Sequence, residues 1–213
     1  MDYYKIVEHY ENCYDNYGDN SRGVDWPNEK DANTRYRIML ELLEYDNRHQ
    51  KQQKEMLSLL DFGCGLGHFL EFIINNETVY DVKYMGMDLS HMYIEHCKKK
   101  YPEYEWIETD ILKDCHQGKY DYIVANGVLT EKREFSFEEF YSYFCRLISK
   151  LYEICECGVA FNVMSSHVDW ARNDLFHLPM DVMASYITKN ITRDFVIRND
   201  YGLYEYTVYL YKG

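Results

Sequence analysis

The sequence predicts an α/β fold: a doubly wound, mostly parallel seven-stranded sheet with a C-terminal antiparallel hairpin, plus an N-terminal helical cap. Three observations support this fold class. Short apolar runs alternate with segments of helical apolar spacing, the first apolar run ends in a glycine-rich turn, and two β-rich runs near the C-terminus are joined by four residues. Alternating strands and helices are typical of a parallel sheet with helices on both faces. A link this short excludes a parallel crossover and predicts a hairpin.

The apolar runs and helical spacings give the expected elements in chain order. Ser90 is a suitable N-cap for the second helix after the glycine turn, because its hydroxyl can accept a backbone N–H. The helices are expected at His68–Asn75, Met92–Tyr101 and Phe137–Ile154. The strands are expected at 56–62, 83–89, 104–109, 121–126 and 158–164, followed by the hairpin strands 194–198 and 203–211.

The first 50 residues are weakly patterned, and we expect residues 1–50 to form a helical and loop cap on an α/β domain at residues 51–213. A short helix is expected at Tyr3–Tyr10. Glycine and proline interrupt Asn16–Asn28, which predicts a loop, and a second helix follows from Asn33. The segment from Asp46 to Lys54 is a charged connection.

Composition narrows the function. The formal net charge is −13, whereas nucleic-acid binding usually needs clustered Lys and Arg, so no nucleic-acid partner is expected. The first residues lack the apolar core of a signal peptide, and no apolar stretch approaches the ~20 residues that span a bilayer, so no membrane partner is expected. The seven cysteines have no framework spacing and are typical of free thiols in a reducing, cytoplasmic setting. A monomer or homodimer is expected.

Polar or glycine residues lie at the carboxyl ends of four successive predicted strands. They are Asp61–Gly67, Asp88, Asp110 and Asn126. Because ligands of an open parallel sheet bind at the carboxyl ends of its strands, these positions predict one ligand site. Glycines let the chain turn sharply and approach a bound molecule closely. A carboxylate at the end of the second strand, as at Asp88, is placed to accept both hydroxyls of a ribose.

Two cofactors suit this pattern, S-adenosylmethionine (SAM) and NAD. Dinucleotide sites use Gly-x-Gly-x-x-Gly, which leaves space for a pyrophosphate. The turn here is Gly-x-Gly-x-Gly and is preceded by Asp61. A carboxylate at that point repels a pyrophosphate and attracts an amino group. SAM has an amino-acid end and a ribose and no phosphate, so the residues favour SAM over NAD.

Residues 59–67, Leu-Leu-Asp-Phe-Gly-Cys-Gly-Leu-Gly, resemble the first motif of the class I SAM-dependent methyltransferases, and residues 86–90, 109–111 and 120–129 resemble the next three. The resemblance extends from about residue 57 to the C-terminus. It implies that the second-motif acid holds the ribose, that the third-motif acid faces the adenine amino group, and that the fourth motif lies near the methyl group. The implied cofactor-binding residues, with S-adenosylhomocysteine (SAH) as the product, are Asp61, Gly63, Cys64, Gly65, Gly67, Asp88, Leu89, Asp110, Ile111, Asn126 and Gly127.

Two residues of the N-terminal segment extend the resemblance. Trp26, followed by Arg35-Tyr36, is similar to a small-molecule subset of the family in which the Trp and Arg sit over the SAM pocket. The resemblance implies that Arg35 meets the cofactor carboxylate. The alternative is a surface arginine on an amphipathic helix.

Candidate catalytic residues follow the fourth and fifth strands. Methyl transfer from a sulfonium is an in-line displacement that depends on positioning. A base is needed only if the acceptor must lose a proton to attack. Asn126 is expected near the methyl group, and His167 and His177 are candidate bases because the ordinary histidine pKa lies near neutrality. Exposure of these histidines in a loop is the alternative.

Candidate acceptor-binding residues surround those histidines. Ser165 and Arg172 lie in the same polar and aromatic segment, and Arg172 suits an anionic acceptor. The alternative for Arg172 is an ion pair with Asp169 or Asp174. We therefore expect Ser165, His167, Arg172 and His177 to bind the acceptor.

Tyrosines are concentrated at both ends of the chain. Tyr14 and Tyr17 are candidates for an aromatic lining of the acceptor pocket, with packing as the alternative. The tyrosines of 201–211 are expected to pack, with the ring inside and the hydroxyl at the surface. No metal site is expected, because the His and Asp residues of 167–177 lack a standard ligand spacing.

The sequence thus predicts an enzyme that transfers a methyl group from SAM to an oxygen or nitrogen atom of a small polar metabolite. A sugar or surface-polysaccharide precursor is a narrower expectation that rests on resemblance alone, since fold does not decide substrate. A protein or RNA methyltransferase is an alternative that requires a basic or elongated groove. A non-catalytic SAM-binding module is another, and it requires an acceptor side closed by side chains.

Overall fold

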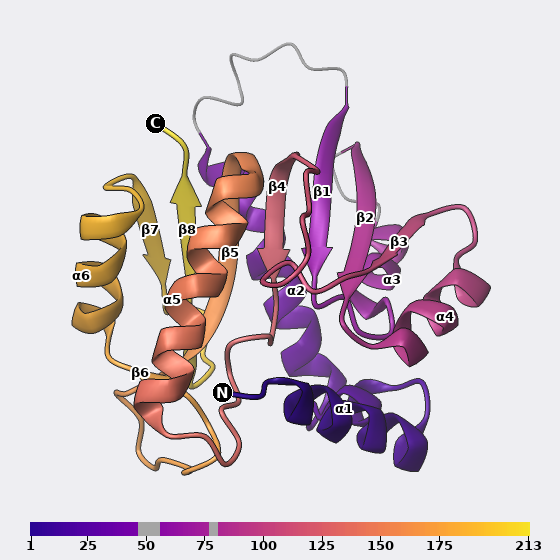
Figure 1. Ribbon diagram of the computed structural model, residues 1–213, viewed down its shortest axis with the longest axis horizontal. Helices are drawn as coiled ribbons and strands as arrows, with labels where there is room; N and C mark the ends of the chain where they lie inside the picture. Colours follow the sequence, from indigo (N-terminus) through magenta and orange to yellow (C-terminus); the bar gives the residue numbers. More distant parts are fainter. Residues whose placement is uncertain (47–55, 77–80) are drawn as a thin grey trace.

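The computed structural model describes residues 1–46, 56–76 and 81–213, and Figure 1 shows their arrangement. Within these residues, eight strands form one sheet in the order β3-β2-β1-β4-β5-β8-β7, with β6 beside β5. Strand β8 runs antiparallel to β5 and β7, and the other pairings are parallel. The strands are β1 (Leu57–Phe62), β2 (Val82–Asp88), β3 (Glu105–Glu108), β4 (Tyr120–Ala125), β5 (Cys155–Ser165), β6 (His177–Leu178), β7 (Phe195–Arg198) and β8 (Glu205–Tyr211).

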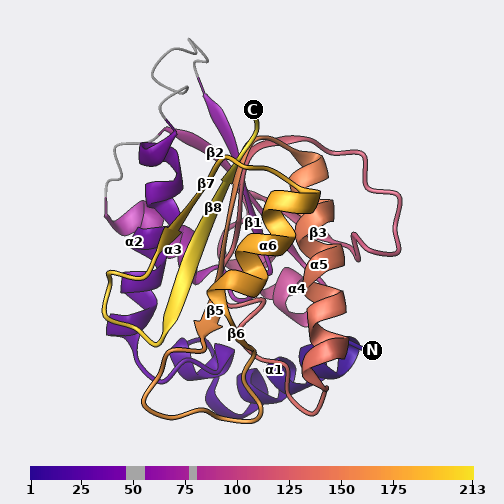
Figure 2. The same ribbon diagram turned by 90° about the vertical axis from the view of Figure 1, so that its left-hand side faces the viewer.

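Helices cover both faces of the sheet (Figure 2). One apolar cluster joins the sheet to α2, α3 and α4, and a second joins the opposite face to α5 and α6. The helices are α1 (Tyr4–Tyr17), the 3-10 helix η1 (Ser21–Val24), α2 (Glu29–Tyr45), α3 (His68–Asn75), α4 (His91–Lys100), α5 (Phe137–Ile154) and α6 (Met180–Asn190).

The predicted fold class is confirmed, including the closing hairpin β7–β8. Ser90 caps α4 as expected, since its side chain accepts the Tyr93 N–H. The structure adds three elements that the sequence did not predict, the 3-10 helix η1, the two-residue strand β6 and the helix α6. Strand β6 raises the sheet from the expected seven strands to eight within the described residues.

The N-terminal elements differ from the expected boundaries. Helix α1 continues to Tyr17, with Cys13 buried in its later turns, and ends at Gly18, whose φ of 70° stops the helix. Helix α2 begins at Glu29 rather than Asn33, because the Asn28 side chain accepts the Asp31 N–H at 2.8 Å and caps the helix earlier. Beyond Asp46, the expected charged connection and the boundary at residue 50 lie outside the described residues.

The tyrosines of β8 pack with their rings inside as expected, but their hydroxyls are buried rather than at the surface. Tyr206, Tyr209 and Tyr211 are buried in the sheet. Their hydroxyls donate to main-chain carbonyls of other elements, including Ile38 and Leu42 of α2. Among the described residues, none of the helices combines the length and the apolar character needed to cross a membrane.

Candidate active site

A pocket lies at the carboxyl ends of β1, β2 and β4, where the sequence predicted the ligand site. It contains about 1030 Å³ of empty space, part of it open to solvent. In Figure 1, α1 lies at this same end of the sheet, beyond the arrowheads of the central strands. The strand-end residues among its lining are Asp61, Phe62, Gly63, Cys64, Gly65, Leu66, Asp88, Leu89, Asn126, Gly127 and Val128.

The glycine turn after β1 requires its glycines. Gly63, Gly65 and Gly67 have φ values of 74°, 53° and 77°, a region that residues with a Cβ rarely occupy. The Gly63 and Cys64 N–H groups both donate to the Met87 carbonyl, at 2.8 and 3.1 Å, which ties the turn to β2. A Cβ on Gly63 would lie 2.4 Å from Val128 Cγ2, so the turn and the β4 loop approach too closely for any side chain.

Asp88 is held by two backbone amides. The Gly65 N–H donates to its Oδ2 at 2.9 Å, and the Ser90 N–H donates to its Oδ1 at 2.9 Å. Burial raises the pKa of Asp88, and these two amides oppose that rise. A carboxylate oxygen can accept more than one hydrogen bond, so both oxygens keep capacity for further donors in the pocket.

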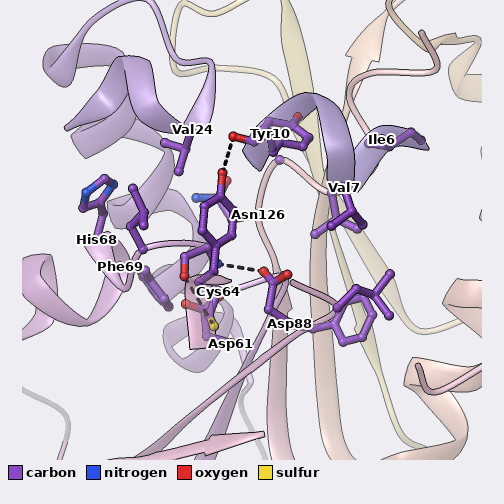
Figure 3. Close-up of a pocket in the computed structure, with 18 of the residues that line it drawn as sticks. Ile6, Val7, Tyr10, Val24, Asp61, Cys64, His68, Phe69, Asp88 and Asn126 are labelled. Carbon is purple, nitrogen blue, oxygen red and sulfur yellow. Dashed lines mark hydrogen bonds between the residues drawn. The ribbon is translucent and has the colours of Figure 1, made fainter. Parts of the chain in front are cut away.

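Asp61 is buried in the pocket wall. The Tyr84 hydroxyl donates to Asp61 Oδ2 at 2.6 Å. Burial raises the pKa of Asp61 to about 7, although the hydrogen bond from Tyr84 opposes the rise. A positively charged group beside Asp61 would offset this cost of burial and favour the ionised carboxylate. Figure 3 shows Asp61 and Asp88 flanking the glycine turn.

A buried polar network connects the end of β4 to the N-terminal helices. The Asn162 Oδ1 accepts the Gly127 N–H at 2.8 Å, and its Nδ2 donates to Glu205 Oε1 at 3.1 Å. Arg35 Nε donates to both Glu205 oxygens, at 3.0 and 2.9 Å. Arg35 Nη1 and, beside Gly127 in the chain, Asn126 Oδ1 are buried atoms with no hydrogen-bond partner among the described residues.

Arg35 is therefore not a surface arginine. Its side chain is 15% exposed, and its guanidinium lies 5.1 Å from the ring centre of Trp26. Trp26 itself lines the pocket, whereas Arg35 lies behind it, outside the pocket lining. The structure thus brings together the two N-terminal residues that the resemblance implied, with the unpartnered Nη1 as the remaining donor.

Asp110 lies under α1. Its Oδ2 accepts the hydroxyls of Tyr3 and Tyr4 at 2.6 and 2.9 Å, and it does not line the pocket. Burial would raise the pKa of Asp110, but the hydroxyls of Tyr3 and Tyr4, the Leu112 N–H and the nearby Lys113 together outweigh burial and hold it below the ordinary value. Ile111 and Gly67 are likewise buried outside the lining. Asp110, the acid of the third motif, is thus hydrogen-bonded to two tyrosines at the start of α1.

Helix α1 and the segment after it form a wall of the pocket, of which only Trp26 was predicted. An i, i+3, i+4, i+7 stripe on the first two turns gives this wall its inner face. Val24 and Trp26 continue the wall after η1. The same spacing was visible in the sequence, but the glycine turn lies far away in the chain and nothing local indicated that they meet. The residues of the stripe are Tyr3, Ile6, Val7 and Tyr10.

The expected acceptor residues lie outside this pocket. His167 is exposed, and the Ser165 hydroxyl accepts its N–H at 3.0 Å. The His177 ring contacts main-chain atoms through both nitrogens, at 2.7 Å from the Ser165 carbonyl and 3.3 Å from the Arg172 amide. Arg172 pairs with Asp174, one of the two partners anticipated as an alternative.

The two candidate tyrosines also lie outside the pocket. The Tyr14 hydroxyl is 3.1 Å from His96 Nδ1, and the Tyr14 ring packs edge-on against Tyr93. Tyr17 is 45% exposed, with the Arg22 guanidinium over its ring. Neither contributes to the pocket wall, so the packing alternative describes Tyr14 better.

Two sequence comparisons agree with this geometry. Residues 60–143, which contain the glycine turn and the ends of β2 and β4, match a family model described as a methyltransferase domain. Rv1506c of Mycobacterium tuberculosis, which carries a provisional methyltransferase name, is 23% identical over 158 residues, covering 73% of this chain and 93% of that protein.

Solved methyltransferase structures share the fold. Magnesium protoporphyrin IX methyltransferase from Synechocystis PCC 6803 with bound SAH has a TM-score of 0.64 at 14% identity, covering 99% of this chain and 100% of that one. The plantazolicin methyltransferase BamL has a TM-score of 0.62 at 13% identity, covering 100% and 91%. NodS, an N-methyltransferase from Bradyrhizobium japonicum WM9, has a TM-score of 0.56 at 16% identity, covering 86% and 97%. Residues 60–143 thus match a methyltransferase domain, and the fold is that of solved SAM-dependent methyltransferases.

Proposed function

We propose that this enzyme transfers the methyl group of SAM to an oxygen or nitrogen atom of a small polar metabolite. One observation carries the proposal: the pocket combines the glycine turn with two carboxylates, Asp61 and Asp88, and its described lining contains no Lys or Arg. Such a pocket suits a ligand with a sulfonium and an ammonium group and opposes a pyrophosphate. When bound, SAM supplies an electrophilic methyl group; the chain's own residues bind and orient the reactants.

In this proposal, Asp88 accepts the ribose hydroxyls and Asp61 pairs with the amino group. Gly63, Cys64, Gly65 and Gly67 provide the close backbone approach. Arg35, behind Trp26, offers its free Nη1 to the carboxylate. Leu89, Asp110 and Ile111 border the adenine, with Asp110 available once Tyr3 and Tyr4 release it. The buried, unpartnered Asn126 Oδ1 supports a place for Asn126 and Gly127 beside the reacting atoms.

Asn126 is the catalytic candidate that we retain. It lines the pocket, and its free oxygen can accept a hydrogen bond from a hydroxyl or amine acceptor and so orient it for in-line attack. His167 and His177 have no such support, because they lie outside the pocket lining. The same holds for Ser165, Arg172, Tyr14 and Tyr17 as acceptor-binding residues.

The acceptor is proposed to be a small molecule with an apolar or aromatic portion. Ile6, Val7 and Tyr10 of α1 give the pocket an apolar wall. The neighbours' names concern magnesium protoporphyrin IX and plantazolicin, which are not nucleic acids. A sugar or surface-polysaccharide precursor stays a narrower proposal.

The setting of the reaction is also a proposal. The seven cysteines are free, which suits a reducing, cytoplasmic compartment. We propose residues 1–50 as the cap and residues 51–213 as the SAM-binding domain, in a monomer or homodimer without a nucleic-acid partner. The lack of Lys and Arg among the described pocket-lining residues opposes an RNA substrate.

Calorimetric titration with SAH, with NAD as the control, tests the cofactor. Binding of SAH alone is expected, and replacing Asp88 by Asn should weaken it roughly tenfold through the lost charged hydrogen bonds. A matched control is Glu95→Gln on the exposed face of α4. NAD binding, or unchanged SAH affinity in folded Asp88→Asn, would contradict the assignment. SAH release with a panel of small acceptors then separates an enzyme from a SAM-binding module without catalysis.

A further inference from the structure

A cluster beside the pocket plays no part in the proposed methyl transfer. His9 and Cys13 lie one turn apart on the same face of α1, and Asp25 follows η1. One ligand-type atom from each of these three side chains lies within 4.8 Å of the other two. No spacing in the sequence groups these three residues, because only the fold brings Asp25 to α1.

The geometry of this cluster distinguishes a catalytic Cys–His–Asp arrangement from a metal site. In a Cys–His–Asp catalytic arrangement, the thiol and the carboxylate contact opposite nitrogens of the imidazole. Here both contacts converge on the same atom, because His9 Nε2 is 2.7 Å from Asp25 Oδ2 and 3.7 Å from Cys13 Sγ. The ring therefore has no route for a proton between them. Three atoms with lone pairs instead surround one point, as the ligands of a metal ion do.

The sulfur–nitrogen distance and the ligand types favour zinc, and Asp25 Oδ2, now 2.7 Å from His9 Nε2, has to move outward by about 0.6 Å to admit the ion. A tetrahedral site with Zn–S of ~2.3 Å and Zn–N of ~2.0 Å separates sulfur from nitrogen by about 3.5 Å, and the Cys13–His9 separation is 3.7 Å. Thiolate, imidazole and carboxylate together are typical zinc ligands. The His9 and Asp25 side chains are 24% and 38% exposed, so water can reach a fourth position.

The surrounding charges are compatible with a divalent ion. Arg133 Nη1 is 3.9 Å from Asp25 Oδ2 and opposes a cation. The same guanidinium is shared with two other carboxylates, at 3.0 Å from Glu131 and 3.9 Å from Asp174. The carboxylates near this point therefore outnumber Arg133, and the excess negative charge favours a cation.

We propose that His9, Cys13 and Asp25 form a zinc site that fastens α1 to the segment after η1. Cys13 binds as the thiolate and its proton passes to solvent, while His9 binds through Nε2. The ion then replaces the hydrogen bond between His9 and Asp25. Tyr10, Val24 and Trp26, the chain neighbours of these ligands, line the pocket, and Figure 3 shows Tyr10 and Val24 at the same side of it. Zinc would thus fix this wall of the pocket.

Cobalt(II) titration of the metal-free full-length protein tests the site, because cobalt replaces zinc and reports its ligands by absorption. We expect one equivalent to bind with a thiolate-to-cobalt charge-transfer band and tetrahedral d–d bands, and zinc to displace it. Cys13→Ser should abolish the charge-transfer band, and His9→Gln should weaken cobalt binding by an order of magnitude or more. Cys115→Ser, at an exposed cysteine, is the matched control and should leave the spectrum unchanged.

Several results would overturn the proposal. They are failure of the wild type to bind one equivalent, binding without a thiolate band, and a band that persists in Cys13→Ser. Zinc protection of Cys13 from alkylation, located by peptide mass mapping in the wild type, gives a second reading that does not depend on a variant folding. Both readouts measure metal binding, so they are independent of methyl transfer.

Discussion

The hydroxyl of Tyr84 donates to the Asp61 carboxylate at 2.6 Å, and both residues are buried at the glycine turn. Tyr84 lies on β2 and Asp61 on β1, so the register of the parallel strands sets this contact. The hydrogen bond only partly offsets burial, which raises the pKa of Asp61 from 3.8 to about 7. The protonation of one pocket-lining group therefore changes near neutral pH.

We predict that SAH affinity rises with pH around neutrality. Below pH 7, Asp61 is mostly protonated and offers no charge to an ammonium group; above pH 7, it is ionised. If binding requires the ionised form, affinity should rise roughly tenfold from about pH 6 to pH 8. Calorimetry across this range measures the effect. Asp61→Asn should bind weakly at every pH, and an equally steep pH dependence in that variant would assign the titration to another group.

The raised pKa of Asp61 also predicts how the free energy of unfolding changes with pH. Because the folded-state pKa is above the ordinary value of 3.8, the folded protein holds a proton that the unfolded chain has released. The contribution of Asp61 to the free energy of unfolding therefore falls as pH rises from about 4 to 7 and is constant above that range. Urea unfolding of the wild type and Asp61→Asn at several pH values measures it. The difference between them should grow in favour of Asn with rising pH.

Alanine substitutions at Gly63 and Gly202 form a matched pair that tests the close approach of Val128 to the glycine turn. Their φ values are 74° and 76°, so an alanine suffers similar backbone strain at both. A Cβ at Gly202 meets open space, whereas at Gly63 it would lie 2.4 Å from Val128 Cγ2. Gly202→Ala should cost about 1 kcal/mol, and Gly63→Ala about 1–3 kcal/mol more. Thermal unfolding and SAH titration measure both effects.

Val128→Ala provides the control for that comparison. Removing the Cγ atoms clears the contact, so Gly63→Ala/Val128→Ala should recover part of the lost SAH affinity. Equal losses in Gly63→Ala and Gly202→Ala would mean that backbone strain alone, and not the approach of Val128, requires glycine at position 63.

Short patterns in the sequence predicted the strands of the sheet and the edge of the sheet at which the cofactor pocket lies. The run Leu57–Phe62, its glycine turn and Asp88 are close in the sequence, and strand ends of a parallel sheet meet at one edge whatever lies between them. The N-terminal wall was different. Its role depends on contacts such as Tyr3 to Asp110, which are 107 residues apart, and no local pattern encodes such a pairing.

The expected acceptor residues lie outside the pocket lining for a related reason. The order of the strands correctly put His167 after β5, and Ser165 is the last residue of that strand, but order alone does not say which side chains face the pocket. In the structure, β6 pairs with β5 through Met164–His177 and Ser165–Leu178, which draws this segment onto the sheet edge. A two-residue strand has too little pattern to predict.

Loss of Glu205 should destabilise the protein strongly. Its side chain is 1% exposed and neutralises Arg35, whose side chain is 15% exposed. Glu205→Ala leaves the Arg35 charge buried without its partner, and we expect a loss of about 3 kcal/mol in the free energy of unfolding. Urea unfolding measures it. Glu95→Ala, which breaks the exposed Lys98–Glu95 pair, should give no measurable change. A similarly small effect for Glu205→Ala would show that water reaches Arg35.

The contact between Tyr3 and Asp110 predicts how firmly α1 is held. The Tyr3 hydroxyl is buried and donates at 2.6 Å to a carboxylate, and hydrogen bonds to charged groups contribute about 2 kcal/mol. Tyr3→Phe should therefore raise hydrogen exchange of the α1 backbone amides by roughly tenfold or more, while β1 and β4 keep their protection. Tyr17→Phe, at an exposed tyrosine of the same helix, is the matched control. If the two variants exchange alike, α1 is held by its apolar face, and the hydrogen bond from Tyr3 to Asp110 adds little to its stability.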